Sequence, residues 1–260
     1  MKTPTVLTIA GSDPYAGAGI QIDSKTIHEL GGYALTAITA LTSQNSTGVT
    51  ALHLTPPEVL QSQIITLLND IHVDSIKIGM LGSAESVMVV AKILEQYPTT
   101  PVILDPIILS SSGRALLSKE GIEAMRERLF PLATLITPNI PECMQLSSIE
   151  CLDEMQYLLE RLNSPAILLK GGHSSDPHTA TDHLITAQGI ESFSAPKIET
   201  THTHGTGCML SSAIATYLAL GESLSQSVAL AKVFLSEQLR NSDINFRYRT
   251  EEKKRKEPII

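Results

Sequence analysis

The stretch THTHGTGCML, residues 201–210, places two glycines and a cysteine directly before a run of small and apolar residues that is typical of a helix. The first N–H groups of a helix have no acceptor within the helix and carry partial positive charge, so glycines at that point let an anion approach the backbone. Gly205, Gly207 and Cys208 therefore predict a binding site for a phosphate group.

Polar and glycine-rich segments also follow five short apolar runs that read as strands. These segments are AGSDPYAGAGIQID, GML, DPIILSSSGR, PNIPE and KGGH. Each one alone is explained by turn formation, because Gly, Asp-Pro and Pro-Asn are common turn residues. Ligands of open α/β sheets bind beyond the carboxyl ends of the strands, however, and five such segments at one edge predict a binding site there.

Three familiar sites do not match the sequence. AGSDPYAGAGIQ offers Gly17 and Gly19 but has Gln at position 21 and Ile at position 22, so the third glycine of a dinucleotide fingerprint is missing. No G-x-x-x-x-G-K-[ST] segment occurs, which excludes a P-loop. His202 and His204 have no acidic or thiol partner at the spacing of zinc ligands, so we do not expect a zinc site. A kinase with this sequence would need another phosphate cradle.

Short apolar runs alternate with longer amphipathic segments along the chain. The runs TVLTIAG, SIKIGM, PVILDP, TLITPN and AILLKGG end at turn residues and are typical of buried parallel strands. Segments 57–71, 83–96, 119–130 and 153–162 carry apolar residues three and four positions apart, which predicts one-sided helices. This alternation predicts an α/β fold, with a central, mostly parallel sheet flanked by helices on both faces.

Two stretches depart from this alternation. Residues 32–54 alternate weakly and show no clear helix, which predicts strands that extend or flank the main sheet and overhang its edge. Residues 182–199 contain a Gln-Gly turn between two alternating runs, which predicts a β-hairpin.

Composition limits the class of protein. The chain has 260 residues, of which 42% are hydrophobic, and we predict one domain over residues 1–245 with a charged tail at 246–260. The net charge of -8 argues against nucleic-acid binding, which depends on clustered Lys and Arg. No segment approaches the ~18 apolar residues of a membrane span, and we recognise no signal peptide. Three cysteines without CxxC spacing favour a reducing compartment, so we expect a cytoplasmic protein with no membrane partner.

The motifs TIAGSDPYAGAGIQID, ITALTSQNSTGV, KIGML, LDPI, TPNIPE, LLKGGH and THGTGC, in this order, resemble those of the hydroxymethylpyrimidine/phosphomethylpyrimidine kinases of thiamin biosynthesis. The resemblance runs from about residue 5 to about residue 240. It implies a ribokinase-like fold, the use of ATP and Mg²⁺, and phosphorylation of a hydroxymethylpyrimidine and then of its monophosphate. We also expect a homodimer.

The resemblance implies roles in phosphoryl transfer for several residues. An anion hole is expected from Gly205, Thr206, Gly207 and Cys208, and Lys170 would bind the nucleotide phosphates, with Asn139 and Thr206 also near the nucleotide. Mg²⁺ and its waters would be organised by Asn139, Glu142 and Asp105. Related kinases often carry Asp in place of Cys208, so the thiol is a candidate base, and we expect the helix N-terminus and Lys170 to favour its thiolate.

The acceptor pocket is expected from the N-terminal half of the chain. The resemblance implies that Gln44 is the residue whose amide contacts the pyrimidine. An amide suits this task because it donates and accepts hydrogen bonds at once. Gly11, Asp23, Met80 and Ile107 are expected to complete the pocket, although each is also compatible with core packing.

The sequence departs from the family at two places. Its segment YAGAG stands where the family often has SGGAG, and its C-terminal end lacks the family's Gly, His and Pro-rich close.

Two alternative functions stay open. One is a kinase of the same superfamily that phosphorylates pyridoxal or pyridoxine, and the other is a non-catalytic module that binds a pyrimidine. The combination of GTGC, Lys170 and Glu142 speaks against the second, since a binding module needs no transfer machinery.

Overall fold

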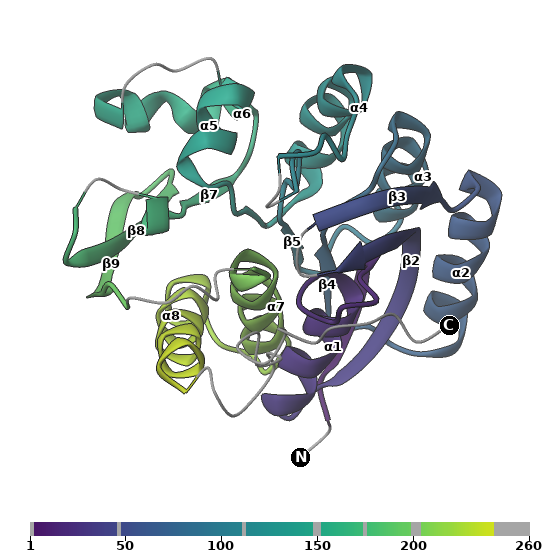
Figure 1. Cartoon of the computed structure of the whole chain (residues 1–260), viewed down its shortest axis with the longest axis horizontal. Coiled ribbons are helices and arrows are strands. Elements are labelled where there is room, and N and C mark those ends of the chain that lie inside the picture. The colour runs from purple at the N-terminus through teal and green to yellow at the C-terminus, as the bar shows by residue number, and fades with distance from the viewer. Residues whose placement is uncertain are drawn as a thin grey trace, which may run out of the picture.

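The computed structural model describes residues 3–45, 48–110, 113–147, 152–173, 176–198 and 204–241. Within these residues nine strands form a single sheet in the order β3-β2-β1-β4-β5-β6-β7-β8-β9 (Figure 1). The strands are β1 (Thr5–Ser12), β2 (Tyr33–Asn45), β3 (Gly48–Leu54), β4 (Ser75–Ile78), β5 (Val102–Leu104), β6 (Leu135–Ile136), β7 (Ala166–Leu169), β8 (Thr179–Thr186) and β9 (Gly189–Pro196). The six strands from β2 to β7 in this order pair in parallel, and β3, β8 and β9 pair antiparallel with their neighbours.

Helices cover both faces of the sheet, as the sequence predicts. The α-helices are α1 (Gly19–Glu29), α2 (Pro57–Asp70), α3 (Ala84–Leu94), α4 (Lys119–Ala124), α5 (Ile140–Ser147), α6 (Leu158–Leu162), α7 (Thr206–Ala219) and α8 (Leu224–Arg240). Side chains alternate along each strand, so Leu7 and Leu104 pack in one core with α2 and α3, while Val6 and Ile103 pack in a second core with α1, α7 and α8.

The predicted strands and the predicted hairpin are found in the structure. The predicted strand runs correspond to β1, β4, β5, β6 and β7. The stretch 32–54, predicted as strands, contains β2 and β3, which pair antiparallel at the edge of the sheet. The predicted hairpin consists of β8 and β9, which are joined through Ala187 and Gln188.

Two of the four predicted helices are not continuous α-helices in the structure. Residues 119–130 begin as α4, continue as a π-helical turn at Met125–Leu129 and enter a 3₁₀ turn at Phe130–Leu132. Pro131 lies in this last turn and has no N–H to continue the helix. Residues 153–162 fall in a 3₁₀ segment, Leu152–Tyr157, followed by α6. The sequence patterns did not single out α1 or α8.

The predicted domain boundary stays a prediction, because the charged tail at 246–260 lies outside the described residues. Among the helices that are described, none is long and apolar enough to cross a membrane.

Candidate active site

The carboxyl ends of the parallel strands and the N-terminus of α7 surround a cavity of about 870 Å³. Twelve of the thirteen predicted site residues line it, and they are Gly11, Gln44, Met80, Asp105, Ile107, Asn139, Glu142, Lys170, Gly205, Thr206, Gly207 and Cys208. Segments far apart in the sequence therefore meet at one place, as expected for an open α/β sheet.

The glycines before α7 allow a close approach between two loops. Gly205 is the N-cap of α7 with φ of 79°, and a Cβ at this position would lie 1.8 Å from the carbonyl oxygen of Gly17. A Cβ on Gly207 would lie 3.1 Å from Nζ of Lys170. Nζ of Lys170 thus lies close to the first turn of α7, whose N–H groups have no acceptor within the helix, and the two together could bind a phosphate group.

Lys170 is held at the cavity by Asp105. Its Nζ donates to Oδ1 of Asp105 at 2.7 Å, and Thr137 donates to the same oxygen at 3.0 Å. Burial disfavours the lysine charge, but the carboxylates of Asp105 and Glu142 outweigh burial and raise the pKa of Lys170. Lys170 is therefore a fixed cation beside the α7 turn.

Asn139 and Glu142 form a capping box at the start of α5. The Asn139 N–H donates to Oε2 of Glu142, and the Glu142 N–H donates to Oδ1 of Asn139, both at 2.8 Å. Burial raises the pKa of Glu142 to about 7; the Asp105 charge adds to this effect and Lys170 opposes it. A cation bound nearby would restore the ionised form of Glu142.

The carboxyl groups of Asp105 and Glu142 fit Mg²⁺. The described residues contain no group of three or more His, Cys, Asp or Glu side chains that could hold a metal alone. Mg²⁺ is usually bound through one or two carboxylates together with water and substrate phosphates, so two carboxyls at the phosphate end of the cavity suffice.

The other end of the cavity can hold a flat ring. A Cβ on Gly11 would lie 2.2 Å from Cε of Met80, so glycine is needed for the Met80 side chain to lie there. Met80 also packs in a small apolar cluster with Leu116 and Ile107. The amide of Gln44 lies next to His204, with 3.1 Å between the Nε2 atoms of the two side chains.

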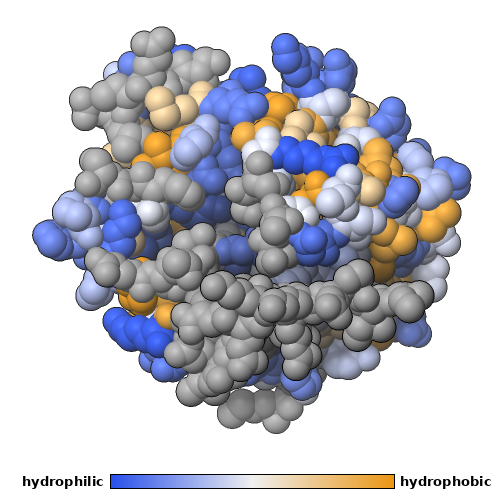
Figure 2. Space-filling model, viewed as in Figure 1, coloured by the Kyte–Doolittle hydropathy of each residue, from blue (hydrophilic) through white to orange (hydrophobic). Residues whose placement is uncertain are grey.

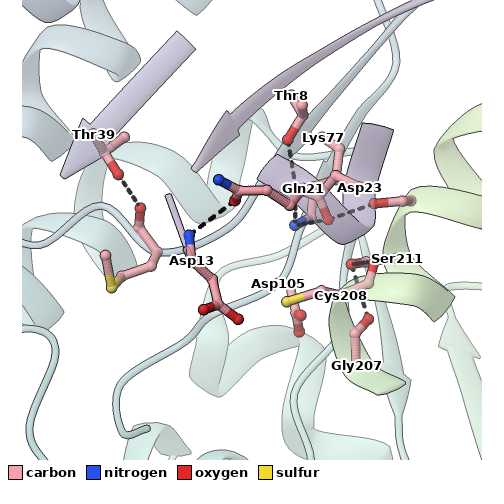
Figure 3. A network of polar contacts seen from close by, with 12 residues as sticks. Thr8, Asp13, Gln21, Asp23, Thr39, Lys77, Asp105, Gly207, Cys208 and Ser211 are labelled. Atoms are coloured by element: carbon pink, nitrogen blue, oxygen red, sulfur yellow. Dashed lines mark hydrogen bonds and ion pairs between the residues drawn. The ribbon is translucent and has the colours of Figure 1, made fainter. Parts of the chain in front are cut away.

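Asp23 lies in the core and not at the cavity, in contrast to the expectation from the sequence. It is fully buried, and its carboxylate accepts from Nζ of Lys77 at 2.7 and 2.8 Å, from Thr8 at 2.6 Å and from Ser212 at 2.8 Å. Figure 3 shows Thr8, Asp23 and Lys77 converging beside α7. A buried carboxylate needs such partners, so its role is to join α1, β1, β4 and α7.

Cys208 is a thiol in this structure, which corrects the expected thiolate. The residue is 6% exposed, and burial raises the pKa of Cys208 to about 11, despite the opposing charge of Lys77 and a backbone hydrogen bond with Gly19. The carboxylates of Asp23 and Asp105 raise this pKa further. Desolvation outweighs the helix N-terminus here because the residue is almost completely buried.

The sequence patterns missed several residues of the site. His204, weighed only as a zinc ligand, and Asp13 line the acceptor end of the cavity. Lys77 lies in the core with Asp23 and not at the cavity, and its place inside the apolar strand SIKI was a detectable signal, because a lysine is rarely buried without a carboxylate partner. His202 lies outside the described residues.

An apolar region from β8, β9, α8 and the segment before β8 completes the cavity beyond Lys170, and no sequence pattern predicted it. Its side chains include Pro177, Ala180, Ala195, Leu235 and Leu239. Flat aromatic ligands such as a nucleotide base are usually held by surfaces of this kind.

Tyr15 and Ala16, where the sequence differs from the family's usual SGGAG, lie in the loop between β1 and α1. Ala16 has φ of 61°, a conformation that favours glycine, and its N–H donates to the carbonyl oxygen of Asp13 at 2.9 Å. The turn therefore keeps a glycine-like backbone although the residue is alanine.

The sheet order, the glycine turn at α7 and the lysine beside it define a ribokinase-like kinase, a phosphotransferase. The family model for phosphomethylpyrimidine kinase matches residues 13–251, and the chain belongs to this family. The chain is 40% identical over 250 residues to the hydroxymethylpyrimidine/phosphomethylpyrimidine kinase of Salmonella typhimurium, covering 94% of this chain and 93% of that protein. It is 42% identical over 243 residues to a thiamine biosynthesis bifunctional protein of Geobacter sulfurreducens, covering 91% of this chain but only 49% of that protein.

Solved structures agree with this family. The phosphomethylpyrimidine kinase of Clostridium difficile is 36% identical, with a TM-score of 0.80 over 92% of this chain and 100% of that one. The pyridoxal kinase of Staphylococcus aureus in complex with AMP-PCP is 31% identical, with a TM-score of 0.83 over 93% of this chain and 89% of that one. The fold is therefore shared with kinases named for two different acceptors.

Proposed function

We propose that the protein uses ATP and Mg²⁺ to phosphorylate 4-amino-5-hydroxymethyl-2-methylpyrimidine, and then its monophosphate, to the diphosphate used in thiamin biosynthesis. One observation carries this proposal: Gln44, the candidate for contacting the ring, and the glycine turn at 205–207, the candidate for binding phosphate, line the same cavity. The names of the Salmonella and Geobacter relatives support the choice of acceptor and pathway.

In the first transfer, the acceptor hydroxyl oxygen forms a bond to the γ-phosphorus, the bond from that phosphorus to the bridging oxygen breaks, and ADP and a proton leave. The N–H groups of the α7 turn and Nζ of Lys170 stabilise charge on the transferring group. Mg²⁺, when bound at Asp105 and Glu142 with its waters, would neutralise charge on the phosphate oxygens.

Cys208 takes part as a neutral thiol. Since a loose phosphoryl-transfer transition state requires little deprotonation of the acceptor before attack, a base with a low pKa is not essential. The thiol is placed at the first turn of α7 and can hold the acceptor hydroxyl in line by accepting or donating a weak hydrogen bond.

A kinase assay with three acceptors tests the proposal. Purified protein with ATP and Mg²⁺ should convert hydroxymethylpyrimidine to mono- and diphosphate, detected by mass spectrometry, and chelation of Mg²⁺ should stop the reaction. Hydroxymethylpyrimidine monophosphate should give the diphosphate alone. Turnover of pyridoxal with none of either pyrimidine would favour the pyridoxal kinase alternative, and binding without any turnover would favour a non-catalytic module.

We further propose that the protein acts as a homodimer in the cytoplasm. Large apolar side chains are exposed near one edge of the sheet, including Leu41 at 55% and Leu54 at 45%. Figure 2 shows hydrophobic residues gathered on the side where Figure 1 places β3, α2 and α3. The free thiols of Cys143 and Cys208 support a reducing compartment. Sedimentation equilibrium at micromolar concentration tests the oligomeric state, and a monomer would contradict the dimer.

A further inference from the structure

The side chains of Asp13, His204 and Gln44 contact one another at the acceptor end of the cavity. Of these three, the proposed function gives a role only to Gln44. His204 lies directly before the anion-hole glycine Gly205. Its Nε2 atom is 3.3 Å from Oδ2 of Asp13 and 3.1 Å from the terminal amide nitrogen of Gln44. A single ring nitrogen thus faces a carboxylate and an amide at the same time.

Asp13 decides where the imidazole proton lies. Asp13 is 3% exposed, and its carboxylate accepts backbone N–H groups of Tyr15, Gly17 and Ala18 at 2.9 to 3.1 Å. Burial opposes ionisation of Asp13, but the hydrogen bonds from His204 and from the backbone outweigh it and lower its pKa. An ionised carboxylate only accepts hydrogen bonds, so Nε2 of His204 must carry the proton.

A donating Nε2 on His204 then requires an acceptor on Gln44. The amide nitrogen of Gln44 is itself a donor, so the contact is favourable only when the amide is turned by 180° and its oxygen faces His204. An amide has nearly the same outline in both orientations, and hydrogen bonding decides between them.

Thr42 provides the partner that this orientation needs. Oγ1 of Thr42 donates to the carbonyl oxygen of Ser12 at 2.9 Å and lies 3.4 Å from the other polar atom of the Gln44 amide. Because the Thr42 proton is already used, its lone pairs can accept an N–H from the turned amide. The single Nε2–H of His204 is then shared between Oδ2 of Asp13 and the amide oxygen of Gln44, and Oγ1 of Thr42 accepts from the amide N–H.

We propose that His204 is a positioning residue that sets the donor and acceptor pattern with which Gln44 reads the acceptor ring. With its oxygen held by the His204 N–H, the amide keeps one lone pair and one N–H for the substrate. This pattern suits a ring nitrogen next to an exocyclic amino group, as in an aminopyrimidine. The inference rests on the proposed function, because it takes Gln44 as the residue that contacts the ring.

A double-mutant cycle on the full-length enzyme tests this role. The variants are His204→Phe, which keeps a ring without a polar atom, His204→Gln, which keeps a donor near the Nε2 position, Gln44→Leu, and the double variant His204→Phe/Gln44→Leu. The matched control is His72→Phe, because Nε2 of His72 also lies 3.3 Å from a carboxylate, Oδ1 of Asp74, in a side chain that is 75% exposed. Steady-state KM and kcat are measured for hydroxymethylpyrimidine, for pyridoxal and for ATP.

We expect His204→Phe to raise the KM for hydroxymethylpyrimidine roughly tenfold, as for the loss of one hydrogen bond, with kcat and the KM for ATP within about twofold of the parent. His204→Gln should recover most of the loss, and His72→Phe should behave as the parent. In the Gln44→Leu background, His204→Phe should add no further loss, because His204 acts through Gln44.

Several outcomes would overturn the role of His204. They are an unchanged KM in His204→Phe, multiplicative losses in the double variant, or a fall in kcat without a change in KM. If the parent phosphorylates hydroxymethylpyrimidine and one of these results is found, the inference fails while the proposed function stands. If the parent turns over pyridoxal alone, or neither acceptor, both the proposed function and the inference fail.

Discussion

Two residues of the site, Cys208 and Glu142, keep their protons to higher pH than their types suggest. Burial raises the pKa of Cys208 to about 11 and the pKa of Glu142 to about 7. The thiol therefore keeps its proton, and the carboxyl group is only partly ionised. Both groups lie beside Asp105, so the positive charge of Lys170 and of a bound metal ion is what balances this end of the cavity.

Alkylation tests the state of Cys208. Because only the thiolate reacts, the rate of inactivation by iodoacetamide should be low at pH 7 and should rise about tenfold per pH unit toward pH 10. Inactivation is followed by residual kinase activity, with Cys208→Ser as the variant that the reagent should not inactivate. A rate that levels off near pH 8 would show a thiol with an ordinary pKa.

Glu142 should make the ligand-free protein less stable as the pH rises. Its folded-state pKa of about 7 lies above the reference value of 4.5, so between pH 4.5 and pH 7 the folded state binds more protons than the unfolded state. The free energy of unfolding must fall with increasing pH in this window. Glu142→Gln removes the titration and keeps an acceptor for the Asn139 N–H.

We expect Glu142→Gln to be more stable than the parent by about 2 kcal/mol at pH 8 and nearly equal to it at pH 5, when compared by urea unfolding at both pH values. Glu85→Gln is the control, since hydrogen bonds at the start of α3 lower the pKa of Glu85 and the pH trend should be absent or reversed. A constant difference between Glu142→Gln and the parent at all pH values would contradict the raised pKa.

At the scale of elements, α7 is the part that joins chemistry to the core. Its first turn is the proposed anion hole, and about two turns later Ser212 donates to the buried Asp23, which in turn pairs with Lys77 of β4. The position of the phosphate-binding N–H groups is thus tied to β1, β4 and α1 by hydrogen bonds to one carboxylate.

Ser212→Ala should therefore destabilise the protein by about 2 kcal/mol, because a bond to a buried charge is lost, and should also lower kcat. Ser211→Ala is a matched control. Ser211 is equally buried, but its hydroxyl donates only to carbonyl oxygens of its own helix, those of Gly207 and Cys208. Its loss should cost less than about 0.5 kcal/mol. Equal unfolding midpoints for the two variants in urea would contradict the role of Ser212.

At the scale of the whole molecule, the one cavity that we propose for both substrates lies between two sets of elements. The acceptor end draws on β1, β2 and β4, and the nucleotide end draws on β7, β8, β9 and α8. The α7 turn lies between the two ends, so ligands at either end stabilise different halves of the same fold.

Thermal unfolding should show that the acceptor and an ATP analogue each stabilise the protein independently. Each one, at about 100 times its Kd, should add about 2.7 kcal/mol to the free energy of unfolding, and together they should add roughly the sum. Lys170→Met should reduce the shift from an ATP analogue and leave the shift from hydroxymethylpyrimidine unchanged. If the two ligands compete, so that their stabilising effects do not add, the proposal that they bind at different ends of the cavity is wrong.

Much of the architecture could be predicted from local patterns. The runs SIKI and VIL are apolar and bounded by turn residues, and the segment after Ser83 carries its apolar residues at helical spacing, so β4, β5 and α3 follow from the sequence. The glycines at 205 and 207 likewise mark close approaches, which the contacts of Gly205 with Gly17 and of Gly207 with Lys170 explain. These features depend on a few neighbouring residues, and for that reason the sequence by itself determined them.

Only the tertiary structure decided how residues distant in sequence act on each other. Asp23 was expected at the pocket but is paired with Lys77, 54 positions away, and His204 meets Gln44 across 160 positions. The proton on Cys208 depends on burial under several segments, which outweighs the local effect of a helix N-terminus. Burial and long-range pairing arise when the chain closes on itself, so no local pattern can contain them.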